Sequence, residues 1–259
     1  MNLSKIFAVA QNILTEGIRH KILNLILVFG ICIIGASLII QELSPGAQSR
    51  TMLDIGLASI HLFGFFTVVF SVGILTFEEI EMRTVWMVFA KPIKRSEYLT
   101  GKYIGIVLTV LLNVCLMSLI LLGLCLLYKV NINISFLVSI IFILFELILV
   151  SAIAIVFSTV STSLVTGMIF TFTLFLIGHL SHHLKYFSAT SENIFLKWTM
   201  KVFYYLIPNL EYFNLKDKLY AIENISIPYG FVFKVFLYML IYSATTLAIA
   251  IAVFDTKEF

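Results

Sequence analysis

Six long apolar runs, separated by polar or charged segments, set the pattern of this chain of 259 residues. The first run holds nineteen residues, and as a helix at about 1.5 Å per residue it reaches about 28 Å, close to the thickness of a bilayer core. The pattern therefore predicts an all-α integral membrane protein with six transmembrane helices at 22–40, 54–76, 103–127, 136–157, 164–180 and 231–253.

The segment before the first run, residues 1–21, has a different pattern. Its polar residues fall on one side of a helix, and its apolar residues recur at helical spacing on the other, namely Ile6, Phe7, Ala10, Ile13, Leu14 and Ile18. Such a helix is too polar to span a membrane and is suited to its surface. We expect an N-terminal interfacial, or elbow, helix.

Two links between the runs stand out, and the others are short and polar. Residues 77–102 are highly charged, and residues 181–230 form the one large loop. Within that loop, 195–206 has an apolar helical face interrupted by Lys197 and Lys201, which favours an interfacial or re-entrant helix over a seventh crossing. We expect a helical extracytoplasmic loop before the sixth span. We find no internal repeat, so 1–259 is predicted to be one transmembrane domain.

Composition supports lipid as the main solvent, because 61% of the residues are hydrophobic and 12% are charged, against roughly a quarter charged in soluble domains. The net charge of +3 and the lack of a long basic run argue against a nucleic-acid partner. Segment 77–102 holds five basic residues, and positive charge near helix ends favours the cytoplasmic side. We therefore expect both termini in the cytoplasm.

Segment 77–102 also predicts a short helix at about 78–90. The helix dipole favours acids in the first turns, here Glu78, Glu79 and Glu81. Pro92 would end this helix, and Ser96 could cap the next one with Glu97 in its first turn. A short helix that lies across the membrane surface between two spans is suited to transmit a movement of a soluble partner to the membrane helices.

The same segment resembles the loop between the second and third spans of type-2 ABC permeases, the exporter-type membrane subunits that pair with separate ATPases. The matching positions are Glu81, Arg83, Thr84, Lys91, Pro92, Ile93, Arg95, Glu97, Tyr98, Gly101 and Lys102. A second phrase, Ile-Pro-Asn-Leu-Glu-Tyr-Phe-Asn at 207–214, is similar to one found in permeases related to the nitrous-oxide-reductase maturation system. With the amphipathic start, the six spans and the enlarged outer loop, the resemblance covers nearly the whole chain.

The resemblance implies a coupling helix that docks into an ATPase dimer, with ATP and Mg²⁺ bound on that partner and no cofactor on this chain. It also implies a second permease copy (homodimer or related heterodimer), the lipid bilayer of a prokaryotic inner membrane, and an extracytoplasmic accessory protein as a further partner. The expected ATPase-coupling residues are Glu78, Glu79, Glu81, Arg83, Thr84, Trp86, Lys91, Pro92 and Arg95.

No catalytic residue is predicted, and the chain is not expected to be an enzyme by itself. A phosphate-binding loop needs glycines followed by Lys and Ser or Thr, whereas Gly101 and Lys102 precede Tyr103 and lack the upstream glycine. Two bland alternatives stay open. In the first, segment 77–102 is only a solvated loop that follows the positive-inside rule. In the second, the chain is a membrane component that anchors an ATPase or signals mechanically through it, without transport. Lipid-like molecules, peptides and drugs all suit an apolar seam as cargo.

Three polar residues inside the predicted spans are candidates for a substrate path or a subunit seam: Glu146, Asn113 and Thr171. An ionised carboxylate at mid-membrane costs roughly 2.5–3.5 kcal/mol on insertion scales, so Glu146 should face protein or a cavity, or be protonated. A simple helix–helix hydrogen bond is the alternative for Glu146 and the favoured interpretation of Asn113. The Ser/Thr-rich stretch 158–173 suits close packing as well as a polar path.

His179, His182 and His183 have a spacing that resembles one histidine box of membrane di-iron desaturases. Such enzymes need several boxes, and this chain has five histidines in all. We therefore expect a polar cap at the membrane surface, with weak metal binding and a metal-dependent enzyme as remote alternatives. The outer-loop aromatics Tyr204, Tyr205, Tyr212 and Phe213 are typical of an interface belt, and a gate over an exit path is the sharper alternative.

Overall fold

The protein is a bundle of long helices in the computed structural model, which describes residues 3–42, 48–81, 94–130, 134–161, 163–181, 195, 197–199, 204, 207–215 and 229–256. In chain order the helices are α1 (Leu3–Arg19), α2 (Lys21–Glu42), α3 (Gln48–Glu81), α5 (Arg95–Leu127), α6 (Ile134–Val160), α7 (Leu164–His179), the 3₁₀ helix η1 (Leu210–Tyr212) and α11 (Tyr229–Thr256). These residues include no strand, which confirms the predicted all-α fold for them.

Within the described residues, five helices are long and apolar enough to cross a membrane by length and composition: α2, α3, α5, α6 and α11. The chain is thus a multi-pass membrane protein. The remaining predicted span, 164–180, corresponds to α7, whose 16 residues reach about 24 Å and fall short of a bilayer core of about 30 Å. Six crossings therefore stay a prediction.

The helices run past the ends of the apolar runs. Helix α3 begins at Gln48, six residues before the predicted span 54–76, and continues to Glu81. The expectation that 78–81 would open a new helix was therefore wrong. No glycine or proline interrupts 77–81, and glutamate is a good helix former, so α3 simply continues beyond its apolar part. The rest of the predicted coupling helix, 82–90, lies outside the described residues.

The start of α5 differs from expectation too. The N-cap is Lys94, not Ser96, which lies inside the helix. Glu97 Oε2 accepts a hydrogen bond from the backbone N of Lys94 at 3.3 Å. The acid three residues into the helix thus satisfies the backbone donor of the N-cap residue itself.

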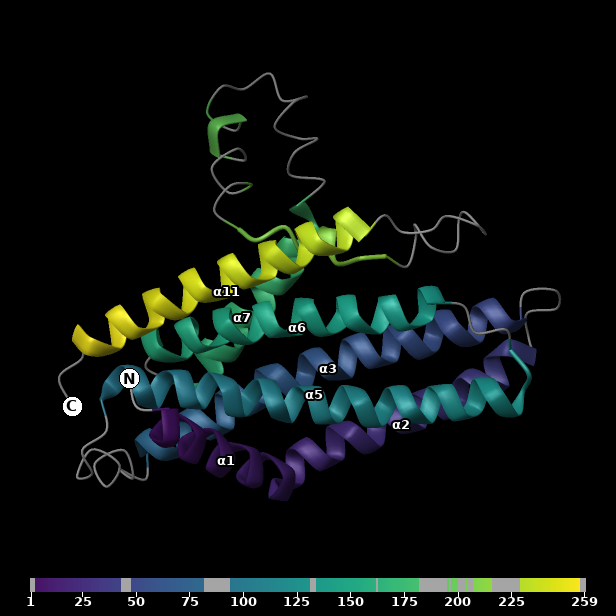
Figure 1. Cartoon of the computed structure of the whole chain (residues 1–259), viewed down its shortest axis with the longest axis horizontal. Helices are drawn as coiled ribbons and strands as arrows, with labels where there is room; N and C mark the ends of the chain where they lie inside the picture. Colours follow the sequence, from purple (N-terminus) through teal and green to yellow (C-terminus); the bar gives the residue numbers. More distant parts are fainter. Residues whose placement is uncertain are drawn as a thin grey trace.

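Helices α3, α5 and α6 lie side by side through the middle of the bundle (Figure 1), and their facing residues form one core. Leu57, Met117 and Leu147, one from each helix, are fully buried there. Asn113 of α5 donates its Nδ2 to Thr67 Oγ1 of α3 at 3.3 Å. This contact is the helix–helix hydrogen bond that the sequence favoured for Asn113.

Helix α1 packs on the first half of α5 through unusually close backbones. A Cβ atom added at Gly105 would lie 2.6 Å from Ile13 Cβ, and one at Gly101 would lie 2.8 Å from Val9 Cβ. Small residues allow such approach between helices. Part of the predicted apolar face of α1 is buried on α5, with Ile6 and Ile13, and part of it is exposed, with Phe7.

Candidate functional site

Two regions combine polar side chains with burial. The first is the end of the bundle at which α3 ends and α5 begins, called here the coupling end, where α11 also ends (Figure 1). Arg95 Nη1 donates to the carbonyl oxygens of Phe254 at 3.0 Å and Asp255 at 3.1 Å. The last carbonyls of a helix lack partners within it, so this guanidinium binds the end of α11 to the start of α5.

Neighbouring residues of α5 strengthen that junction. The ring of Tyr98 stacks on Phe254 with 6.2 Å between centroids. Lys102 is buried and donates its Nζ to the Tyr98 hydroxyl at 3.2 Å, which gives its charge a polar partner. Gly101 sits against α1. The described part of the phrase that resembled type-2 permeases thus joins the ends of α1, α5 and α11.

Most of the predicted ATPase-coupling residues cannot be placed as side chains. Glu78, Glu79 and Glu81 belong to the last turns of α3 by backbone alone. Arg95 is described above. The remaining five lie outside the described residues: Arg83, Thr84, Trp86, Lys91 and Pro92.

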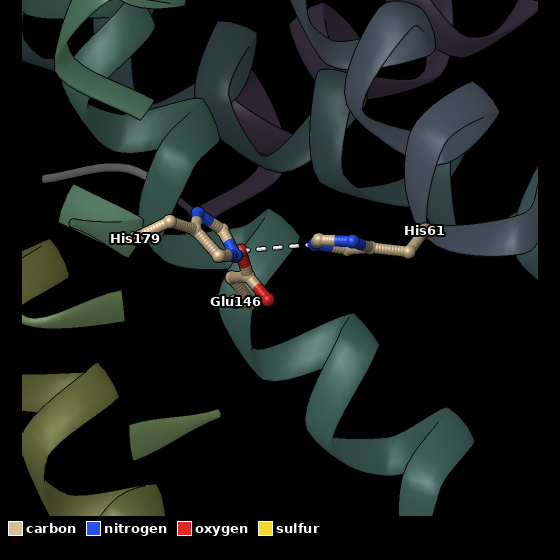
Figure 2. A group of neighbouring side chains, drawn as sticks. All are labelled: His61, Glu146 and His179. Carbon is tan, nitrogen blue, oxygen red and sulfur yellow. Dashed lines mark ion pairs between the residues drawn. The ribbon is translucent and has the colours of Figure 1, made fainter. Parts of the chain in front are cut away.

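The second region is a cluster of His61, Glu146 and His179, from α3, α6 and α7 (Figure 2). The three side chains point at one another, and both imidazoles approach the same carboxylate oxygen. His61 Nε2 lies 3.0 Å and His179 Nε2 lies 3.2 Å from Glu146 Oε1. The three helices therefore bring two nitrogen donors and one oxygen donor to a single point.

The carboxylate of this cluster is buried and the two imidazoles are partly buried. The side chain of Glu146 is 3% exposed, that of His61 15% and that of His179 25%. Glu146 Oε1 and His61 Nε2 have no hydrogen-bond partner in spite of the short distances. His179 Nδ1 lies 3.1 Å from the carbonyl oxygen of Phe175. Buried polar atoms without partners are uncommon in proteins and call for an explanation.

A cavity of about 100 Å³ opens beside the cluster, and its other lining residues are Ser139, Ile143, Phe213, Asn214 and Leu215. On another side, Phe175 lies against both histidine rings, with centroids 5.6 Å from His61 and 4.6 Å from His179. Phe65 stacks on Phe175 at 3.8 Å. The cluster thus has an aromatic wall and a polar opening.

The short length of α7 explains the cavity. Glu146 lies about 18 Å along α6 from Ile134, at about 1.5 Å per residue. Helix α7 runs back along α6 and ends beside Glu146, which leaves the far part of α6 without this neighbour. Segment 207–215 occupies part of that space, since Leu210 is fully buried and a Cβ at Gly178 would lie 2.7 Å from Leu210 Cγ.

Asn209 fixes segment 207–215 in place. Its Oδ1 accepts from Ser181 Oγ at 2.8 Å and from the backbone N of Glu211 at 3.1 Å. Its backbone N donates to the Tyr238 hydroxyl of α11 at 3.0 Å. The second phrase of the resemblance therefore forms a bonded wall of the cavity. Phe213 in it is buried and Tyr212 is half exposed, whereas Tyr205 lies outside the described residues.

The sequence singled out Glu146 and His179 for separate reasons and missed His61. The signal for His61 was present, because an ionisable residue inside an apolar run is a functional candidate by default. Asn113 and Thr171 do not line this cavity. Thr171 bonds the carbonyl oxygen of Gly167 in its own helix at 2.9 Å. His182 and His183 lie outside the described residues.

Comparison with known proteins agrees with the multi-pass helical fold. The family model described as "ABC-2 family transporter protein" matches residues 2–259. The comparison with curated proteins gave no match. A match of this extent covers the helices, the coupling end and the His–Glu cluster together, and the chain therefore belongs to the ABC-2 family of membrane transport proteins.

Proposed function

We propose that this chain is the permease subunit of an ATP-driven exporter, in which hydrolysis of ATP by a separate ATPase moves a substrate across or out of the membrane. The family match over residues 2–259 is the observation that carries this proposal. ATP and Mg²⁺ belong to the ATPase in this scheme. Segment 77–102 faces the cytoplasm of a prokaryotic cell, together with both termini, and docks into the ATPase.

The coupling end supports this mechanism. In the sequence, segment 82–93 lies between α3 and α5, and α3 is one uninterrupted helix of 34 residues from Gln48 to Glu81. Arg95 links the start of α5 to α11, and the Gly101–Gly105 surface links it to α1. A displacement of segment 82–93 by an ATPase would therefore move four helices as connected elements, which is how packed helices pass on a conformational change.

Two permease copies and two ATPase copies complete the proposed assembly. Helices α2 and α11 are the most exposed of the spanning helices, with 22% of each apolar window buried. Lipid covers such surfaces in a single subunit, and a second copy would cover part of them around a central seam. An accessory protein outside the membrane is a further partner in this scheme.

Charge reversal at the predicted docking segment tests the proposal. The double variant Glu81→Lys/Arg83→Glu, co-expressed with the cognate ATPase, is expected to lose ATPase recovery in a pulldown on the permease. The matched control is Arg50→Glu/Asp54→Arg, which reverses an exposed pair 3.6 Å apart near the opposite end of α3. ATPase recovery that is unchanged in the first variant would contradict the docking assignment.

Transport itself needs a second assay. Liposomes that hold the complex should show ATP hydrolysis stimulated by a cargo and movement of that cargo. Hydrolysis without movement of any cargo, in a complex that still assembles, would replace export by the anchoring or mechanical-signalling role.

A further inference from the structure

We propose that His61, Glu146 and His179 form a binding site for a divalent transition-metal ion of the Zn²⁺ class, open to the cavity beside them. This inference goes beyond the proposed transport function and does not depend on an ATPase. It rests on the donor set, on the distances among the donors, on the unpartnered buried atoms and on the room left for further ligands.

The donor set matches the chemistry of such ions. Two imidazole nitrogens and one carboxylate oxygen are a ligand combination used by zinc sites that keep an open position. Imidazole suits zinc, copper, iron and nickel, whereas calcium and magnesium prefer oxygen ligands only. With two nitrogens among its three donors, the cluster selects for the first group of metals.

The distances fit a common metal centre. At Zn–N and Zn–O distances of about 2.0–2.1 Å, two ligands of a tetrahedral ion lie about 3.3 Å apart. The two nitrogen–oxygen separations here are 3.0 and 3.2 Å, and all three donor atoms lie within 4.8 Å of one another. A small rotation of the imidazoles closes the remaining gap.

The hydrogen bonds favour a metal over a simple ion pair. A carbonyl oxygen can only accept, so His179 Nδ1 donates to Phe175 and the other ring nitrogen, Nε2, faces the cluster. A bond from the non-ligating nitrogen to a carbonyl is the usual support of a metal-bound histidine. Neither ring donates a hydrogen bond to Glu146 Oε1 in spite of the short distances.

The cavity supplies the rest of the coordination shell. It holds about 100 Å³ and its polar lining includes Ser139 and Asn214, so water or a small ligand could take the fourth position. A dication would also offset the cost of a carboxylate that is buried at mid-helix, as the Glu146 side chain is. The ion would link α3, α6 and α7.

Metal binding can be measured on the full chain in lipid nanodiscs, after removal of metal by a chelator. We expect one Zn²⁺ per chain by calorimetry and by elemental analysis. Glu146→Gln and His61→Gln should weaken binding at least about tenfold, since each removes a ligand. The control His20→Gln changes a histidine at the junction of α1 and α2, outside the cluster, and should bind Zn²⁺ as the unaltered chain does.

A spectroscopic probe keeps the test independent of folding defects. Co²⁺ in place of Zn²⁺ should give the visible absorption of a four-coordinate site with nitrogen and oxygen ligands, and this absorption should be absent in Glu146→Gln protein that elutes as a folded species. The assignment is overturned if the unaltered chain binds no Zn²⁺, if folded Glu146→Gln binds it unchanged, or if binding is lost in His182→Gln/His183→Gln but retained in Glu146→Gln.

Discussion

The coupling end and the His–Glu cluster both place polar side chains inside the bundle, but they differ in how many of those polar atoms are hydrogen-bonded. At the coupling end, Arg95, Glu97 and Lys102 each bond to a neighbour on the same or an adjacent helix. In the cluster, Glu146 Oε1 and His61 Nε2 are brought together without a hydrogen bond. Buried polar groups are costly unless satisfied, so the first arrangement is suited to holding helices and the second to receiving a ligand.

Removal of metal is expected to have the largest effect on stability, and this effect should come from the cluster and not from the coupling end. If the cluster binds Zn²⁺, a free concentration of about 100 times Kd adds about 2.7 kcal/mol to the free energy of unfolding. Chelation should therefore lower the Tm of the unaltered chain clearly more than that of Glu146→Gln, which binds the ion more weakly. Differential scanning fluorimetry measures both changes, and an equal fall of Tm in the two proteins would contradict a metal site at Glu146.

Close packing at the coupling end should give the next largest effect. Gly105→Ala places a Cβ 2.6 Å from Ile13 Cβ and 2.8 Å from the carbonyl oxygen of Ala10, and such overpacking costs about 1–3 kcal/mol. Gly123→Ala on the same helix meets nothing within 4 Å and should leave Tm unchanged or raise it slightly. Thermal unfolding of both variants in detergent tests this, and equal Tm values would contradict the close contact.

Loss of the Arg95 side chain should have a smaller and more local effect. A cation at a helix C-terminus contributes about 0.3–1 kcal/mol, and Arg95→Ala removes the donor to Phe254 and Asp255. Hydrogen exchange at the end of α11 should become faster, whereas exchange in the middle of α6 should not. Uniform acceleration along the chain would indicate general destabilisation instead.

The smallest effect is expected at Asn113, whose single bond to Thr67 joins α3 and α5. Hydrogen bonds of this kind between membrane helices average about 0.6 kcal/mol. Asn113→Leu should therefore lower stability only slightly and leave Zn²⁺ binding intact. A loss of cargo movement in this variant, at unchanged stability, would indicate instead that Asn113 belongs to the substrate path.

The two regions also differ in how much of their structure the sequence could predict. Apolar runs long enough to cross a bilayer predicted the helices, and the cost of a mid-membrane carboxylate marked Glu146, since both depend on local pattern. The cluster depends on contacts between residues far apart in the chain, and the lone His61 carries no spacing that indicates its partners. The ends of α3 and α5 were misplaced because helix propensity continues after apolar residues stop.

The docking of segment 77–102 into an ATPase is the claim on which the transport account depends. A photo-reactive amino acid at position 83, in membranes that contain the permease and its cognate ATPase, tests it most directly. The account predicts a cross-link to the ATPase from position 83 and none from position 50, which lies near the opposite end of α3. A cross-link from position 50 alone would place segment 77–102 on the wrong side of the membrane and contradict the account.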